Sequence, residues 1–272
     1  MKTFSRSSVL KLAAASCVAL ASSFASAGNI LLTGHDTDDH NATAFMNWGL
    51  TLLTTGNGTV VPVAPTARIG YIGSMNSFSL ASYFGNYNNY EAYDVSAASW
   101  TDAFTDNNAV LVIGSGLDYI SSSESALLNA SAGLFASFFN AGGSLFVNTH
   151  QGLGQSFYNF LPPVGNVAAS NLTTCSSESG SGRCMTPTAA GAASGLALSA
   201  IVGANITHNQ FSNFGPTFTA YETYVPTGNA ITIGLIGGKI DDGGFVVSVP
   251  EPAPLVLLGL GLLGLALRRR NA

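Results

Sequence analysis

The chain has 272 residues, a formal net charge of −5 at pH 7 and only 8% charged residues, against roughly 25% in ordinary soluble proteins. Between positions 28 and 249 the basic residues are Arg68, Arg183 and Lys239. Because no basic patch is available to neutralise phosphates, we expect no binding to nucleic acid. This central part is long enough for one large domain, and its Asn-, Ser- and Thr-rich composition suits an extracellular environment.

The N-terminus has the three-part layout of a secretory signal peptide. An apolar run over residues 9–21 follows a basic start, and the small residues Ala25 and Ala27 then stand at the two positions that a signal peptidase inspects. The basic residues are Lys2, Arg6 and Lys11. The run is shorter than the roughly 20 residues that span a membrane, and a lipoprotein signal at Cys17 is disfavoured by the small Ala14 before it. We predict a signal peptide over residues 1–27 and a mature chain beginning at Gly28.

The first half of the central part predicts strands and one helix. Residues 29–33 form a short apolar strand, which a polar loop over residues 34–41 follows. Apolar residues at helical spacing between Ala44 and Leu52 predict a helix that Asn41 can cap. Further strands are expected over residues 60–63, 68–72 and 92–95.

The clearest pattern is a strand, a helix and a second strand in the middle of the chain. Residues 109–113 are continuously apolar, as a strand buried on both faces requires. Ser121 and Glu124 fit a capping box that starts an amphipathic helix, and Gly142-Gly143 ends it. The apolar residues expected to fill this helix are Leu127, Leu128, Leu134, Phe135, Phe138 and Phe139. Because a strand over residues 144–148 follows directly, this βαβ unit predicts a parallel sheet.

The last third of the central part predicts strands without long helices, over residues 217–224, 230–236 and 245–249. The predicted fold class is therefore α/β. We expect a mostly parallel sheet flanked by helices, in a flavodoxin-like or amidotransferase-like arrangement, with a strand-rich C-terminal part.

Two cysteines remain after removal of the signal peptide. Cys175 and Cys184 bracket a polar segment rich in Gly and Ser. In an oxidising compartment, an even pair that closes a short loop is typical of a disulfide. Metal ligation and a redox pair are the alternatives, but the spacing differs from C-x-x-C and no His lies between the two residues.

The densest group of polar residues is G-H-D-T-D-D-H-N over residues 34–41. In open α/β sheets, ligands bind beyond the carboxyl ends of the strands. Asp36, Asp38 and Asp39 are the predicted ligands of a divalent cation, either Ca²⁺ in an oxygen-rich site or Zn²⁺ or Mn²⁺ where an imidazole joins them. Apart from such an ion, no cofactor is expected. The alternative is a solvated loop in which Asp39 or Asn41 caps the next helix.

Histidines supply the remaining candidate chemistry. His150 follows the predicted strand over residues 144–148, so the same topological rule puts it on the edge of the acidic loop. His35, Asp36 and His150 are the candidate catalytic residues, acting as acid and base or around a metal ion. The alternative for His150 is a histidine hydrogen-bonded in a turn. His208 is a further candidate without strand context, and the G-x-S-x-G elbow of a serine hydrolase is missing from this part of the sequence.

Two segments carry a family resemblance. The first strand, I-L-L-T, runs into G-H-D at residues 34–36, and the second segment is G-G-S-L-F-V-N-T-H over residues 142–150. This order resembles the class I glutamine amidotransferase-like superfamily, especially its ThuA-like branch. Amidotransferases have a catalytic Cys on the turn after the second strand, and its absence here argues against glutaminase chemistry. ThuA-like proteins commonly have a His at this place, which His150 matches.

The C-terminus has a proline-containing motif, an apolar helix predicted over residues 254–267 and a basic cluster, in that order. The motif is Val249, Pro250, Glu251 and Pro252, and the cluster is Arg268, Arg269 and Arg270. The helix is short for a bilayer of about 30 Å, and its arginines are expected on the cytoplasmic side. Residues 250–272 resemble the PEP-CTERM sorting signal. The resemblance implies processing by an exosortase, anchoring in the inner membrane in transit, and then the cell surface or extracellular matrix of a Gram-negative bacterium.

Two functions are compatible with these features. The first is a non-catalytic envelope or matrix protein whose domain over residues 28–249 associates with exopolysaccharide, and which meets signal peptidase and exosortase as processing partners. The alternative is a ThuA-like enzyme acting on carbohydrate, or a metal-dependent domain that binds a small molecule. The sorting tail, the low charge and the missing nucleophile favour the first, because fold alone does not decide function.

Overall fold

The computed structural model describes residues 28–38, 42–56, 67–74, 89–116, 119–149, 154–161, 168–172, 184–203, 207–241 and 244–247. All of them belong to one compact unit, Ala27–Val247. Its elements in chain order are β1 (Gly28–Thr33), α2 (Thr43–Thr55), β2 (Ile69–Ile72), β3 (Tyr90–Tyr93), η1 (Ala98–Phe104), β4 (Val110–Ile113), α4 (Ser122–Ala130), α5 (Ala132–Asn140), β5 (Ser144–Val147), η2 (Gly154–Phe160), β6 (Ala168–Asn171), β7 (Met185–Pro187), α6 (Ala189–Ala193), α7 (Leu198–Gly203), β8 (Asn209–Ser212), β9 (Thr219–Tyr224), β10 (Ala230–Asp241) and β11 (Gly244–Val247).

The N-terminal half of the chain builds a parallel sheet. Its strands lie in the order β3-β2-β4-β5-β1 and every neighbouring pair is parallel. The chain leaves β2 toward β3 on one side, and leaves β4 toward β5 on the other. The topological switch point, where open α/β sheets commonly bind ligands, therefore lies between β2 and β4.

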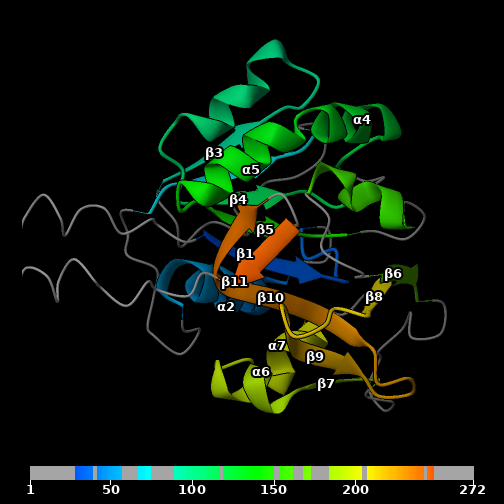
Figure 1. Ribbon diagram of the computed structural model, residues 1–272. Coiled ribbons are helices and arrows are strands. Elements are labelled where there is room, and N and C mark those ends of the chain that lie inside the picture. Colours follow the sequence, from blue (N-terminus) through cyan, green and yellow to red (C-terminus); the bar gives the residue numbers. More distant parts are fainter. Residues whose placement is uncertain are drawn as a thin grey trace, which may run out of the picture. The chain divides into compact units, whose positions relative to one another are not determined.

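The C-terminal half adds antiparallel strands to the same sheet. The long strand β10 pairs with β1, and β8, β9 and β11 also pair with β10. β6 pairs with β8, and β7 pairs with β9. Figure 1 shows β7 and β9 grouped with the short helices α6 and α7. The predicted α/β sheet flanked by helices, with a strand-rich C-terminal part, is confirmed.

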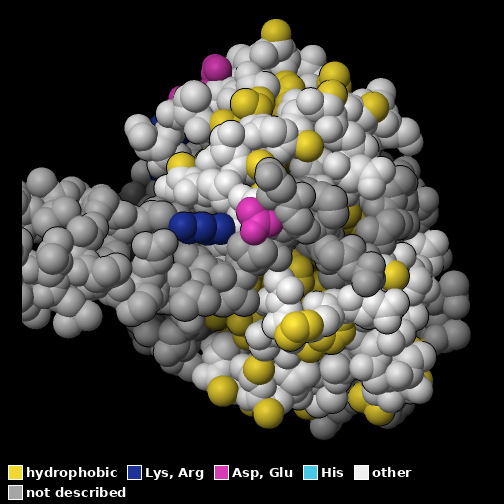
Figure 2. Space-filling model, viewed as in Figure 1, with side chains coloured by type: hydrophobic (Ala, Val, Ile, Leu, Met, Phe, Trp, Pro, Cys, Tyr) yellow, Lys and Arg dark blue, Asp and Glu magenta, His cyan; other side chains and the backbone are white. Residues whose placement is uncertain are grey.

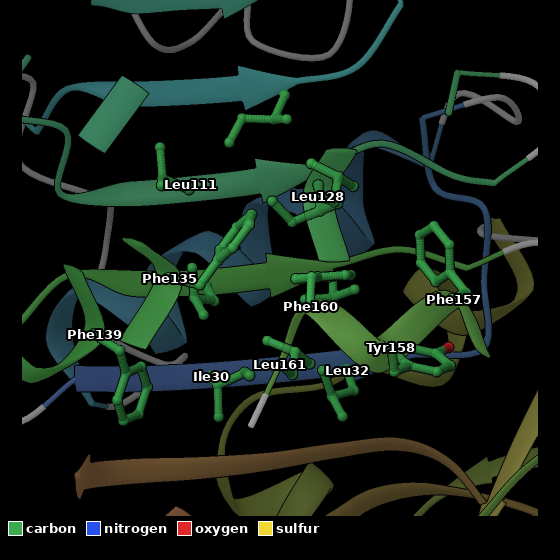
Figure 3. Packing of buried hydrophobic residues seen from close by; sticks show 14 of the residues in the cluster. Ile30, Leu32, Leu111, Leu128, Phe135, Phe139, Phe157, Tyr158, Phe160 and Leu161 are labelled. Carbon is green, nitrogen blue, oxygen red and sulfur yellow. The ribbon is translucent and has the colours of Figure 1, made fainter. Parts of the chain in front are cut away.

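Helices cover both faces of the parallel strands, which explains their continuous apolar sequences. Alternate residues of β1 point to opposite faces. Ile30 and Leu32 join a cluster with the aromatic residues of α5 and η2, which Figure 3 shows from close by. Leu31 joins a second cluster, in which α2 packs with residues of α7. Charged side chains are sparse on the face in Figure 2.

The predicted central helix is two helices. The capping box of Ser121 and Glu124 is present, but α4 ends and α5 begins at Ser131, whose ψ of 15° leaves the helical range. The break changes which residues face the core. Leu127 and Leu134 are 45% and 41% exposed, so the expectation that they fill the buried face is wrong.

Several predicted elements lie outside the described residues. These are the signal peptide, the Asn41 cap, the strand over residues 60–63 and the C-terminal helix over residues 254–267. None of the helices that the structure describes is long and apolar enough to cross a membrane. The domain boundary at residue 249 also remains a prediction.

Candidate functional site

Polar side chains gather where three parallel strands end. The strands β1, β4 and β5 run in the same direction, so the residues after them meet at one edge of the sheet. We call this the carboxyl edge. Its buried polar residues are His35, Asp36, Thr37, Asp38, Ser115, Asn148 and Thr149. Tyr158, Thr207, Asn209, Glu222 and Thr232, which are also buried, and the partly exposed His208 contact these residues or lie beside them.

His35 is held by a buried carboxylate. Its Nε2 lies 3.1 and 3.0 Å from the two carboxylate oxygens of Glu222, and both side chains are fully buried. Thr232 Oγ1 donates to Glu222 Oε2 at 2.8 Å, and Thr207 Oγ1 lies 3.1 Å from His35 Nδ1. Since both ring nitrogens are engaged, the imidazole orientation is fixed. The pair joins the loop after β1 to β9 and β10.

Asp36 pairs with the histidine that had no strand context in the sequence. His208 Nε2 lies 2.9 Å from Asp36 Oδ2. The Asp36 side chain is fully buried, whereas that of His208 is 13% exposed. The His208 backbone N–H donates to Gly34 O at 2.8 Å, which brings the residue beside β1. His208 is thus the part of this pair that solvent reaches.

The Asp38 side chain binds residues on both sides of the topological switch point, which lies between β2 and β4. Its Oδ2 accepts hydrogen bonds from the Tyr71 hydroxyl at 2.7 Å and from the Ser115 backbone N–H at 2.8 Å. The residue is 1% exposed. Burial raises the pKa of the Asp38 carboxyl to about 6, although the hydrogen bonds from Ser115 and Tyr71 oppose this effect. Asp38 therefore titrates near neutral pH, unlike an ordinary aspartate.

The end of β5 contributes a second group of buried polar atoms. Thr37 Oγ1 donates to Asn148 Oδ1, and Asn148 Nδ2 donates to Ile113 O at 3.1 Å. Tyr158 is 3% exposed, and burial raises the pKa of its hydroxyl while the nearby Thr149 hydroxyl lowers it. Asn209 is fully buried and lies against Gly34, since its backbone N–H donates to Gly34 O at 3.3 Å.

The structure places some of the predicted site residues at the carboxyl edge and does not describe others. His35, Asp36 and Asp38 all lie at the carboxyl edge, but they bind three different sets of partners. Asp39 and His150 lie outside the described residues, so their roles remain predictions. Glu222 was missed, because a single Glu in an ordinary strand gives no local signal.

The described residues do not fit a three-ligand metal site. Asp36 Oδ2 faces His208, and Asp38 Oδ2 is engaged by two donors. Among the residues that the structure describes, no three His, Cys, Asp or Glu side chains lie close enough together to hold a metal ion. The divalent-cation prediction therefore depends on Asp39 and His150. A thermal-shift titration with Ca²⁺, Mn²⁺ and Zn²⁺ tests it, because an ion that binds only the folded chain raises Tm.

Cys184 is disulfide-bonded. Its predicted partner, Cys175, lies outside the described residues, so the pairing remains a prediction.

Comparison with known proteins identifies the tail. A family model described as the PEP-CTERM protein-sorting motif matches residues 248–270. The resemblance of the C-terminus is confirmed, and the chain is a substrate for exosortase sorting that is exported, anchored in a membrane in transit and then brought to the cell surface. Comparison with curated proteins and with solved structures gave no match.

Proposed function

We propose that this chain is a non-catalytic protein of the cell envelope or extracellular matrix, whose α/β body binds exopolysaccharide at the carboxyl edge. The sorting motif supports the location. The proposed ligand is a hydroxyl-rich molecule, because the carboxyl edge offers both hydrogen-bond donors and acceptors from several strands.

One observation carries the proposal. Buried side-chain atoms without a hydrogen-bond partner among the described residues are concentrated at the carboxyl edge. They belong to Asp38 (Oδ1) and Asn209 (both amide atoms). The hydroxyls of Ser115, Thr149 and Tyr158 also lack a hydrogen bond of good geometry, although Ser115 lies near the Asp38 carboxyl group and Thr149 near the Tyr158 hydroxyl. Elsewhere such atoms are single amide oxygens, those of Asn47, Asn108 and Asn129.

Buried polar atoms without hydrogen bonds carry a cost in free energy that a bound ligand can remove. A buried polar atom left without a partner costs about 1–3 kcal/mol, so native proteins keep few of them. A ligand that supplies hydroxyl groups to several such atoms recovers that free energy on binding. The same atoms would also order water in the free protein, which the ligand then displaces.

Calorimetric titration tests the proposal. The full-length chain, held in a detergent without a sugar headgroup, is titrated with oligosaccharides released from the extracellular polysaccharide of the producing bacterium. We expect binding, and we expect Ser115→Ala, Thr149→Val and Tyr158→Phe each to weaken it about tenfold, the equivalent of one lost hydrogen bond. The control is Asn129→Ala, which removes an unpartnered oxygen from α4. Absence of binding, or equal loss in the control, contradicts the proposal.

A second candidate is an enzyme acting on carbohydrate, and Asp38 is the observation that favours it. A carboxyl group with a pKa of about 6 can both donate and accept a proton near neutral pH. The His208–Asp36 pair lies at the same edge. Mass spectrometry of the oligosaccharides after incubation decides between the two. Products that Asp38→Asn abolishes would identify an enzyme, and unchanged oligosaccharides support the binding protein.

A further inference from the structure

We propose that the carboxyl edge selects an amino sugar, with Asp38 receiving the ligand's amine. This inference rests on the proposed function and adds to it the charge of the ligand. It predicts that the protein binds polysaccharide carrying free amino groups better than neutral polysaccharide, and that it rejects polysaccharide carrying carboxylates.

The charges at the two edges of the sheet are the first reason. The carboxyl edge holds the carboxyl groups of Asp36, Asp38 and Glu222, all buried. The Lys and Arg residues that the structure describes are Arg68 and Lys239. Arg68 directly precedes β2, and Lys239 lies beyond the residue of β10 that pairs with the first residue of β1. Both therefore lie toward the opposite, amino edge, and neither offers a cation to the carboxyl edge.

The three carboxyl groups differ in how they are compensated. Glu222 and Asp36 each lie within hydrogen-bond distance of a histidine ring nitrogen. The donors to Asp38 among the described residues are neutral. The Tyr71 hydroxyl and the Ser115 N–H bind Oδ2, and the Ser115 hydroxyl and the Asp38 backbone N–H also act on the carboxyl group. Its Oδ1 has no partner among the described residues. Asp38 is therefore the one of these three carboxyl groups that has no histidine, lysine or arginine partner among the described residues.

A second atom beside Asp38 points to a ligand at the same place. The Ser115 hydroxyl is fully buried, lies near the Asp38 carboxyl group and makes no hydrogen bond of good geometry in the described part of the chain. It belongs to the residue whose N–H already binds Asp38. A bound group at this point would meet a carboxylate oxygen and a hydroxyl together. An ammonium has three donors and no acceptor, so it can donate to both.

The expected preference for an amine over an N-acetyl group or a carboxylate follows from how each group interacts with Asp38. An ammonium–carboxylate hydrogen bond is roughly twice as strong as one between neutral groups, and the low dielectric of a buried site strengthens it further. An N-acetyl group keeps one N–H but loses the charge. A uronic acid places a second carboxylate near Asp38, which like-charge repulsion disfavours.

Three matched probes test the inference on the full-length chain in the same detergent. They are a glucosamine hexamer, its fully N-acetylated form and a galacturonate hexamer, titrated at neutral pH. We expect the amine form to bind at least about tenfold more tightly than the N-acetylated form, consistent with one charge-assisted bond, and the galacturonate to bind most weakly.

Variants connect the preference to Asp38. Asp38→Asn keeps the size of the side chain and should bind the amine and N-acetyl forms equally. Glu91→Gln is the matched control, since it removes an exposed carboxylate from β3 and should leave the preference unchanged. Ser115→Ala should weaken both forms while the amine form stays the tighter one.

The outcomes separate this inference from the function on which it rests. Equal or tighter binding of the N-acetyl or galacturonate probe overturns the amino-sugar inference, and so does a preference that survives Asp38→Asn. If the chain binds oligosaccharides of its own bacterium but none of the three probes, the inference fails and the proposed function stands. If it binds neither set, both fail.

Discussion

The two edges of the parallel sheet differ in how their polar side chains are buried and hydrogen-bonded. At the carboxyl edge, buried polar groups come from residues far apart in the chain and several atoms lack partners. Toward the amino edge, Arg68 contacts Glu91, and Tyr93 donates to Asp106 at 2.9 Å and accepts from Asn108 at 3.1 Å. Arg68, Glu91 and Asp106 are partly exposed, so water can reach them. Tyr93 and Asn108 are buried, and the amide oxygen of Asn108 is a single unpartnered atom among the described residues here. Unsatisfied groups that are also buried are costly, and their higher number at the carboxyl edge is the reason for proposing that ligand binds there.

The amino edge is also where the ends of the compact unit lie. Gly28 of β1 and Val247 of β11 both pair with Gly238 of β10, one on each side. A side chain at position 28 would meet the backbone oxygens of Phe139 and Gly143 at 2.6 and 2.7 Å. The first residue after the predicted cleavage site is thus packed into the sheet, which makes this edge structural.

The largest expected difference between the edges is in the cost of losing a carboxylate. Glu222→Ala breaks a fully buried pair with His35 and should lower the free energy of unfolding by about 3–5 kcal/mol. Glu91→Ala removes a partner of Arg68 that is 51% exposed and should cost no more than about 1 kcal/mol. Urea unfolding midpoints of the two variants measure the difference. Equal midpoints would break the comparison.

A second prediction concerns pH. The pKa of Asp38 is raised from 3.8 to about 6 in the folded chain, so the folded state holds this proton more tightly than the unfolded state. The resulting stability is fully present below about pH 4 and is lost as the pH rises through 6, on the order of 3 kcal/mol in total. Asp38→Asn should remove this fall and be more stable than the wild type at pH 7. A parallel pH dependence of unfolding in the two chains would show that Asp38 is not the cause.

The smallest predicted effect compares two tyrosine hydroxyls. The Tyr158 hydroxyl makes no hydrogen bond of good geometry among the described residues, although Thr149 lies near it, so Tyr158→Phe should change the free energy of unfolding by no more than about 0.5 kcal/mol. Tyr93→Phe removes contacts to Asp106 and Asn108 and should cost about 1–2 kcal/mol. Chemical denaturation resolves the two values. A larger cost for Tyr158→Phe would mean that its hydroxyl is satisfied in the free protein.

Sequence reasoning succeeded where the cause of a structure is local. The apolar run over residues 109–113, the capping box and the strand after Gly143 lie close together in the chain, so periodicity and caps identify the β4–α4–α5–β5 unit. The break at Ser131 was not predicted, because serine is an ordinary helix residue. In the structure the chain forms two helices there, and Leu127 and Leu134 are exposed.

The candidate site was predicted only in part, because its partners are distant in sequence. His35, Asp36 and Asp38 follow an apolar strand, and topology alone puts them at the carboxyl edge. Glu222 is 187 residues from His35, and His208 is 172 residues from Asp36. Such pairs depend on how the antiparallel half folds back beside β1, which no local pattern in the chain specifies.

Amide chemical-shift mapping by ¹H–¹⁵N NMR would show whether the ligand binds at the carboxyl edge of the sheet. Oligosaccharides from the producing bacterium are added to the labelled chain until the shifts stop changing. We expect the largest changes at residues 34–38, Ser115, Thr149 and His208, and unchanged amides at Arg68, Asn108 and Gly238. Changes confined to the amino edge, or none at all, would contradict it.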